Sequence, residues 1–318
     1  MPMTFDLYVA SCTKNGGIYK YRISDENPPK LISFAPMDRP MYMIKSGKKM
    51  HVLLRAPFEN GESGLVSYDF DENNDLSSPT KPISTKGRVA CHLCCKNDSI
   101  FAANYVSGSV FKSDGTLITH TGSGVNLPRQ ESAHTHFVYN TPDDKYLCVC
   151  DLALDKIFIY DDDLREISSV DMPKGHGPRH LAFHKDKKHV FCANELASTL
   201  SVLKYSDGKM TLIDTISTLQ DGFEGENYPA AIRCENNTVF VSNRGHNSVS
   251  VINFDSEKQK LTLQNTFSCG GNWPRDLIIH QDLAIVANEY SHNVSIISLK
   301  DFKEIQRIDV RSALCLCV

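Results

Sequence analysis

Three arginines, two histidines and a glutamate in this chain have the chemistry to handle a small anion. They are Arg179, Arg244, Arg275, His134, His136 and Glu195. A guanidinium binds carboxylate or phosphate through two parallel hydrogen bonds, and a histidine or glutamate beside it can move protons near neutral pH. If these side chains meet, they predict acid–base chemistry on an anionic small molecule. The alternative is a set of solvated charges, or an internal Arg–Glu network that holds the fold together.

His134 and His136 stand two residues apart in a segment with strand character, so their side chains point to the same side. A His-x-His pair can bind a metal, but only the distant Glu195 or Asp151 offers a third ligand. Two interpretations therefore stay open, a catalytic or substrate-binding pair and a metal site. The pattern does not say which of the two histidines acts.

The elements that position these residues repeat along the whole chain. An apolar strand ends in a small polar or charged residue, a short turn follows, and a second apolar strand begins, as in VFCANELASTLSVLKY and VFVSNRGHNSVSVINF. The residue that ends the first of these strands recurs every 43–49 positions, at Ser11, Arg55, Asn104, Asp151, Asn194, Asn243 and Asn288. A repeat of this length built only from strands predicts an all-β, seven-bladed β-propeller with four-stranded antiparallel blades.

One repeat shows how a blade is wired. Its four strands are expected at 179–184, 189–195, 198–205 and 209–217, with polar turns between them. In a propeller the first strand of each blade is innermost and antiparallel to the second, so the start of the first and the end of the second lie at one face. That rule brings the six residues named above together. It adds Gln130, Asn194, Asn243 and Tyr105, with Arg275, as expected substrate contacts.

The chain begins on the second strand of a blade and ends in a spare apolar run, SALCLCV. We expect residues 312–318 to supply the innermost strand of the first blade, which closes the ring and removes an exposed edge. No linker or low-complexity tract interrupts the repeats, so residues 1–318 are expected to form a single domain.

Composition and charge limit the kinds of binding partner that we expect. The net charge of −4 gives no basic surface for nucleic acid, and no apolar run of about 18 residues is present to span a membrane. The first residues lack the basic and apolar regions of a signal peptide, which favours the cytoplasm. The oligomeric state stays open.

Eleven cysteines suggest metal chemistry at first sight, because Cys91, Cys94 and Cys95 are closely spaced. No second pair follows at zinc-site distance. Five others sit in apolar strand segments: Cys148, Cys150, Cys192, Cys315 and Cys317. We expect reduced, structural thiols and no metal or cofactor.

Several segments resemble the lactonase family of seven-bladed propellers, which includes propeller-type 6-phosphogluconolactonases and carboxy-cis,cis-muconate lactonizing enzymes. They include GHGPRHLAFHKDKKHVFCANELASTLSVLKY, GGNWPRDLIIH and SAHTHFVYNTPDDKYLCVCDLALDKIFIY. The resemblance covers essentially the whole chain. It implies a catalytic-face histidine at His134 or His136 and catalytic roles for Arg179, Glu195 and Arg244, and it matches the family's Pro-Arg-Asp arginine to Arg275.

The chain also departs from the family. Ala153 stands in a turn that usually carries glycine, Ala231 stands where an acidic residue is often found, and Arg55-Ala56-Pro57 replaces the usual Asn-Glu ending. The first two blades are therefore the part of the expected site that matches the family least.

The resemblance implies hydrolysis of an anionic sugar lactone, with 6-phospho-D-glucono-1,5-lactone of the pentose phosphate pathway as the preferred substrate. Lactone hydrolysis needs an activated water, a stabilised oxyanion and a protonated leaving group, which the histidines, Glu195 and the arginines can supply without a cofactor. One rival is an enzyme of the same fold with another substrate, including a lactonizing cycloisomerase. Another is a non-catalytic scaffold, although the single Trp and the absence of Trp-Asp endings argue against it.

Overall fold

The computed structural model describes residues 4–318, which form strands joined by turns and include no helix. The described residues therefore include no helix that could cross a membrane. The strands form seven antiparallel sheets, one for each predicted repeat. They pack into two compact units, one of residues up to Ala90 with Cys269–Val318 and one of Cys91–Ser268. The single domain over residues 1–318 stays a prediction.

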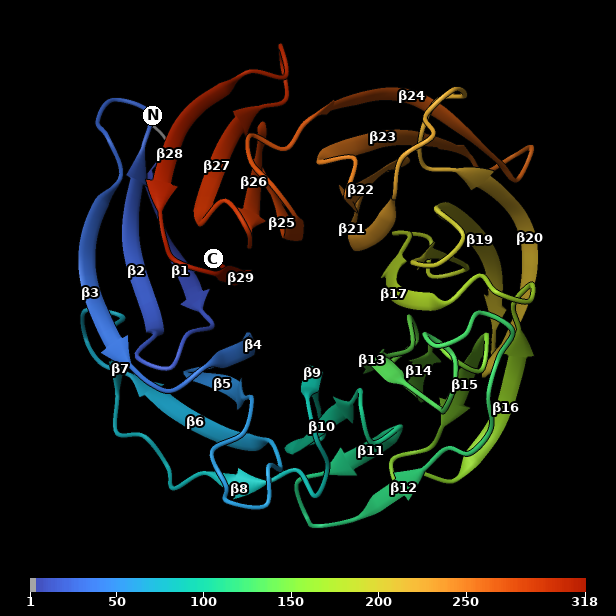
Figure 1. Ribbon diagram of the computed structural model, residues 1–318, viewed down its shortest axis with the longest axis horizontal. Coiled ribbons are helices and arrows are strands. Elements are labelled where there is room, and N and C mark those ends of the chain that lie inside the picture. Colours follow the sequence, from blue (N-terminus) through green and yellow to red (C-terminus); the bar gives the residue numbers. More distant parts are fainter. Residues whose placement is uncertain (1–3) are drawn as a thin grey trace. The chain divides into compact units, whose positions relative to one another are not determined.

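The first unit holds three sheets (Figure 1). One sheet has the order β29 (Ala313–Cys317), β1 (Thr4–Ser11), β2 (Gly17–Ser24), β3 (Lys30–Pro36). The next contains β4 (Pro40–Ser46), β5 (Lys49–Leu54), β6 (Gly64–Phe70), β7 (Leu76–Ser77) and β8 (Ile83–Ser84). The third contains β25 (Pro274–His280), β26 (Leu283–Asn288), β27 (Asn293–Ser298) and β28 (Glu304–Asp309).

The second unit holds four sheets of four strands, the first of which begins at the unit boundary. It contains β9 (Ala90–Lys96), β10 (Ser99–Asn104), β11 (Ser109–Lys112) and β12 (Leu117–Thr119). Then come β13 (Thr135–Asn140), β14 (Leu147–Asp151), β15 (Lys156–Tyr160) and β16 (Glu166–Asp171). The third has β17 (Pro178–Phe183), β18 (His189–Asn194), β19 (Thr199–Ser206) and β20 (Lys209–Ser217). The last has β21 (Tyr228–Glu235), β22 (Thr238–Arg244), β23 (Ser248–Asp255) and β24 (Lys260–Ser268).

The predicted closing strand is confirmed. β29 pairs antiparallel with β1, with Val9 opposite Leu316 and Ala10 opposite Cys315, and takes the first position in that sheet (Figure 1). Its side chains are buried from Ala313 to Leu316. The two ends of the chain therefore share one sheet, which leaves no unpaired edge at β1.

The β4–β8 sheet is the exception to four strands per blade. The place of its fourth strand is shared by the two-residue strands β7 and β8, which both pair with β6. Pro79 and Pro82 lie in the segment between them. A proline has no N–H to donate to a ladder, so this segment cannot run as one continuous strand.

Apolar side chains that alternate along the strands pack between neighbouring sheets. In the second unit, Phe137, Cys150 and Ile157 of one sheet meet Leu181 and Cys192 of the next. Each fully buried side chain of this size contributes about 1.5–3 kcal/mol. Cys148, Cys150, Cys192 and Cys315 are buried in strands as predicted, and Cys317 is half-buried.

The turn from the second to the third strand of a blade has a common conformation. Its last residue has a positive φ between 51° and 60° at Gly108, Asp155, Ser198, Asn247 and His292. This left-handed conformation reverses the chain within four residues. In each of these blades the residue that ends the second strand is therefore held at a tight bend.

Candidate active site

Three arginines surround the buried carboxylate of Glu195 in the second unit. Arg179 Nε donates to Glu195 Oε2 at 3.0 Å, and Arg244 Nη2 lies 2.6 Å from the same oxygen. Arg129 Nη2 donates to the other oxygen, Oε1. Burial raises the pKa of Glu195, but Arg244, Arg179, His136 and Arg129 outweigh it and hold that pKa well below its ordinary value. Glu195 is therefore ionised near neutral pH, and three cations around one anion leave the cluster positively charged.

The strands carry these residues to one place as the repeat predicted. Arg179 is the second residue of β17, and Glu195 directly follows β18, where Pro178 pairs with Asn194. Arg244 ends β22 in the next sheet, whose first strand β21 lies against β17 (Figure 1). Residues 65 positions apart in sequence thus meet because they occupy equivalent positions in neighbouring sheets.

The turn before β17 needs a glycine. Gly177 has φ +64°, and its carbonyl accepts a hydrogen bond from Glu195 N at 2.8 Å. A Cβ at this position would lie 2.7 Å from the Cγ of Leu196. Glycine therefore lets the chain pass close to residues 195–196 and fixes the approach of Arg179 to Glu195.

Arg129 was not predicted from the sequence, because it lies in the loop between β12 and β13 and in no repeat position. The neighbouring Gln130 is fully buried and holds this loop: its Oε1 accepts from Val125 N and Asn126 N, and its Nε2 donates to Leu152 O. The substrate contact predicted for Gln130 stays a prediction, and these bonds show that its side chain holds the loop. The recurrence of Pro-Arg at 128–129, as at 178–179 and 274–275, is the signal that could have indicated Arg129.

His134 is half-buried and held in one orientation. Its Nδ1 lies 3.0 Å from the carbonyl oxygen of Tyr105 and must donate to it, and its ring stacks on that of Tyr105 at 4.4 Å. Its backbone N–H donates to Asp151. A neutral imidazole that donates from Nδ1 carries its lone pair on Nε2, so this contact fixes which ring nitrogen of His134 carries the hydrogen.

His136 lies deeper, among other aromatic rings. It is 5% exposed, and its ring centroid lies 5.1 Å from that of His180 and 5.5 Å from that of Tyr105. His180 in turn lies 5.1 Å from His92. Burial lowers the pKa of His92 to about 3 and that of His180 well below its ordinary value, so both rings are neutral near pH 7. The histidine pair is thus divided between an accessible member and a buried one.

The predicted substrate contacts Asn194 and Asn243 are fully buried. The Nδ2 of Asn194 donates to Ser201 Oγ at 2.8 Å, and that of Asn243 to Ser250 Oγ at 2.7 Å. Both residues tie the end of the second strand to the third strand of their own blade. Tyr105 lies differently: its hydroxyl is 3.5 Å from Arg129, beside the cluster.

Arg275 belongs to the first unit. It is the second residue of β25, and its Nη1 lies 3.4 Å from Oε2 of Glu289, which follows β26. Both side chains are partly exposed, at 25% and 21%. In its own unit Arg275 therefore forms a pair that repeats the Arg179–Glu195 motif.

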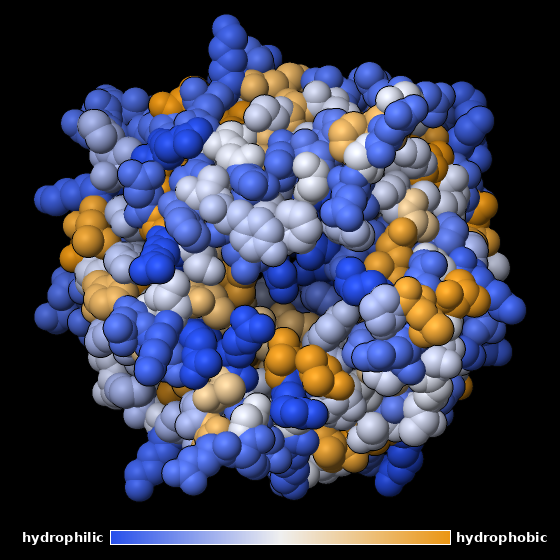
Figure 2. Space-filling model, in the orientation of Figure 1, coloured by the Kyte–Doolittle hydropathy of each residue, from blue (hydrophilic) through white to orange (hydrophobic). Residues whose placement is uncertain are grey.

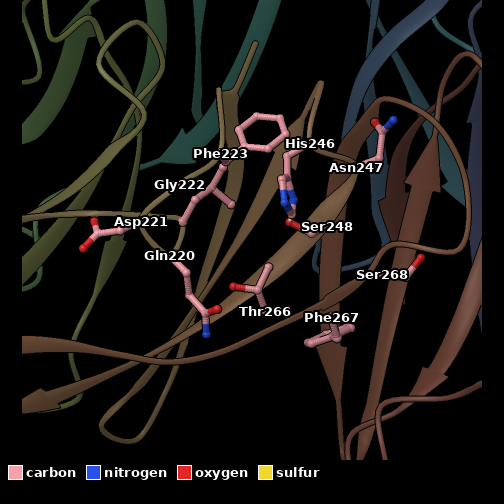
Figure 3. Close-up of a pocket in the computed structure, with 11 residues that line it drawn as sticks. Gln220, Asp221, Gly222, Phe223, His246, Asn247, Ser248, Thr266, Phe267 and Ser268 are labelled. Carbon is pink, nitrogen blue, oxygen red and sulfur yellow. The ribbon is translucent and has the colours of Figure 1, made fainter. Parts of the chain in front are cut away.

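A cavity of about 580 Å³ lies elsewhere in the second unit, between the loop after β20 and the β22–β23 turn. Figure 3 shows Phe223 and His246 at one end of this cavity and Gln220 and Thr266 at the other. The rings of Phe223 and His246 meet edge to face at 4.5 Å. None of the residues around Glu195 lines this cavity.

The chain thus combines seven antiparallel sheets of a propeller with a positively charged cluster around Glu195. The family model described as "Lactonase, 7-bladed beta-propeller" matches residues 6–315. The chain therefore belongs to the lactonase family of seven-bladed β-propellers, and the predicted fold class is confirmed.

Individual relatives agree with this assignment. The chain is 31% identical over 314 residues to a 6-phosphogluconolactonase of Bacillus subtilis, an alignment that covers 90% of the chain and 89% of the relative. It is also 31% identical to an uncharacterized protein of Staphylococcus aureus, with 90% of each covered. A crystal structure of a Lactobacillus plantarum protein superposes with a TM-score of 0.88 at 26% identity and covers 99% of both chains.

Proposed function

We propose that this protein hydrolyses the lactone of an anionic sugar acid, with 6-phospho-D-glucono-1,5-lactone as the preferred substrate. The observation that carries the proposal is the excess of positive charge around Glu195, where Arg129, Arg179 and Arg244 face one buried carboxylate. Such a cluster attracts phosphate or carboxylate groups. The similarity to a Bacillus subtilis 6-phosphogluconolactonase supports this substrate and a role in the pentose phosphate pathway.

In the proposed reaction, water adds to the lactone carbonyl, the ring C–O bond breaks, and the leaving alkoxide takes up a proton. His134 is the base that we propose for the water, because the Tyr105 carbonyl holds its Nδ1–H and leaves Nε2 to accept a proton. Its conjugate acid returns the proton to the alkoxide. The arginines stabilise the oxyanion and the phosphate.

Glu195 acts differently from a general base in this scheme. A carboxylate whose pKa is held far below neutrality by neighbouring guanidinium groups is a weak proton acceptor. We assign it the role of a positioning residue that aligns Arg179 and Arg244. His136 forms the buried wall beside it.

The histidine assignment is tested by comparing two alanine variants. His134→Ala should lower kcat by about 10²–10⁴-fold, the usual contribution of proton transfer. His136→Ala should change kcat much less and should mainly affect packing. A larger loss in His136→Ala than in His134→Ala would reverse the assignment.

The substrate is tested by a spectrophotometric assay on freshly generated 6-phosphogluconolactone and on gluconolactone, each corrected for spontaneous hydrolysis. We expect a higher kcat/KM for the phosphorylated lactone, and a preference that weakens as salt screens the arginines. Equal values for both lactones would contradict the proposed phosphate recognition. Turnover of a muconate-type dicarboxylate in place of both would favour the lactonizing rival.

The scaffold rival predicts no turnover of any lactone. Scaffold surfaces usually carry a continuous apolar patch. Figure 2 shows one face of the molecule, on which apolar side chains form small patches among hydrophilic ones. This face therefore gives little support to a scaffold function.

A further inference from the structure

Two histidines and an aspartate meet at the turn between β17 and β18. His184 follows β17, His189 begins β18 and Asp186 lies in the turn. The Nδ1 of His189 is 2.6 Å from Asp186 Oδ2, and the Nδ1 of His184 is 3.0 Å from the same atom. Each of the three residues offers one possible ligand atom, and these atoms lie within 4.8 Å of one another. We propose that this turn binds one zinc ion through these atoms, with water as the fourth ligand, where the sequence predicted no metal.

The far side of two ligands is already held in place. His184 Nε2 lies 3.1 Å from Asn237 Oδ1 and donates to it, which leaves the Nδ1 lone pair facing Asp186. The other oxygen of Asp186, Oδ1, accepts from the backbone N–H groups of Lys188 and His189 at 2.7 and 3.1 Å. Metal sites hold their ligands in this way, because such contacts fix the tautomer and the orientation of each ligand.

One carboxylate oxygen lies between the two imidazoles. Asp186 Oδ2 is 3.0 Å from Nδ1 of His184 and 2.6 Å from Nδ1 of His189, so a proton or a cation can bridge these atoms. Two imidazole nitrogens, one carboxylate oxygen and water form a ligand set that suits zinc. The imidazoles are buried, at 4% and 8% side-chain exposure, while Asp186 at 29% gives access to solvent.

The equivalent turn of the preceding sheet serves as an internal comparison. There Thr141 and Tyr146 take the places of the two histidines, and Asp143 takes the place of Asp186. Asp143 Oδ1 accepts from Lys145 N at 3.2 Å, so it stabilises the turn in the same way. Thr141 Oγ1 also donates to Asp143 Oδ1, at 2.7 Å. A hydroxyl at this place therefore serves the turn as well, and the two imidazoles are what distinguishes the β17–β18 turn as a candidate zinc site.

The proposed zinc site is separate from the proposed catalytic centre. Arg179 lies five residues before His184 on one strand, and Glu195 lies six residues after His189 on the next. At about 3.3 Å per residue the two sites are roughly 15–20 Å apart. Zinc would therefore stabilise the hairpin rather than take part in hydrolysis. The lysines at 185, 187 and 188 flank the turn and weaken its attraction for a cation, an effect that salt screens.

The experiment is a titration of untagged, metal-free protein with Zn²⁺ and with Co²⁺, whose visible absorption reports tetrahedral coordination. We expect one ion per chain, a higher Tm with the ion bound, and unchanged kcat/KM after chelation. Asp186→Asn should lose binding, and Asn237→Ala, which lies outside the hairpin, should weaken it about 10–100-fold. The matched control Asp143→Asn should bind as the wild type does.

Failure of the wild type to bind either ion would overturn the proposal, as would binding unchanged in Asp186→Asn and Asn237→Ala. The titration is done at a temperature where the protein is folded, because thiols exposed by unfolding also bind zinc. Loss of turnover on chelation, with restoration by zinc, would contradict the separation of the two sites. Neither binding result depends on lactone hydrolysis.

Discussion

The same four residue types stand at the same places in the β17–β20 and β25–β28 sheets. Pro178-Arg179 faces Asn194-Glu195 in one, and Pro274-Arg275 faces Asn288-Glu289 in the other, with Pro178 paired to Asn194 and Pro274 to Asn288. The Arg179–Glu195 pair is 3.0 Å apart and almost fully buried. The Arg275–Glu289 pair is 3.4 Å apart and about a quarter exposed.

The difference comes from what surrounds each pair. Glu195 also receives Arg244 from the next sheet and Arg129 from a loop that Gln130 holds in place. Within the described residues 4–318, the ion-pair partner of Glu289 is Arg275. The motif alone therefore makes an ion pair, and its neighbours convert one copy into a positively charged cluster around a buried carboxylate.

The largest expected difference is in stability. Glu195→Gln removes the anion from between the buried cations Arg179 and Arg244. Breaking a buried pair in this way typically costs about 3–5 kcal/mol. Glu289→Gln should cost at most about 1 kcal/mol, as for a more exposed pair. Urea unfolding of both variants at pH 7 measures this. Equal losses of stability would show that burial does not distinguish the two copies.

Next in size is the effect on catalysis. Arg179→Ala leaves Arg129 and Arg244 to balance the charge of Glu195, so the variant should fold. Its kcat/KM should fall about ten- to a hundred-fold, because a charge-assisted contact to the substrate is lost. Arg275→Ala should raise KM by less than about tenfold if Arg275 contacts the substrate as predicted. Steady-state kinetics on 6-phosphogluconolactone separates the two. If Arg275→Ala lowered kcat/KM as much as Arg179→Ala or more, the assignment of substrate recognition to the Arg179–Glu195 copy of the motif would be contradicted.

The smallest effect is on the acid dependence of stability. The pKa of Glu195 is lowered in the folded state, so its contribution is present above the ordinary carboxylate pKa and is lost as pH falls through the lowered value. The stability difference between wild type and Glu195→Gln should therefore shrink below about pH 4. The difference for Glu289→Gln should be small at both pH 7 and pH 3. Unfolding at these two pH values is the measurement, and a Glu195→Gln difference that grows in acid would contradict the lowered pKa.

Much of the fold followed from local pattern. Strand alternation and turn residues depend on neighbours in sequence, so the repeat predicted the strands at 178–183, 189–194 and 209–217 to within about one residue. It also predicted the closing strand at 313–317. The meeting of Arg179, Glu195 and Arg244 followed as well, because equivalent positions in a repeat occupy equivalent places in space. The interrupted fourth strand after β6 was missed, although Pro79 and Pro82 indicate it.

Tertiary structure decided what the repeat does not encode. Arg129 reaches Glu195 from a loop whose path depends on Gln130 and its distant partner Leu152. The orientation of the His134 ring depends on the Tyr105 carbonyl, which follows β10 of another sheet. The pairing of His184 with Asn237 likewise joins separate sheets. Each of these contacts joins residues far apart in sequence and depends on the direction of a side chain. The repeat pattern of a single sequence gives information on neither property.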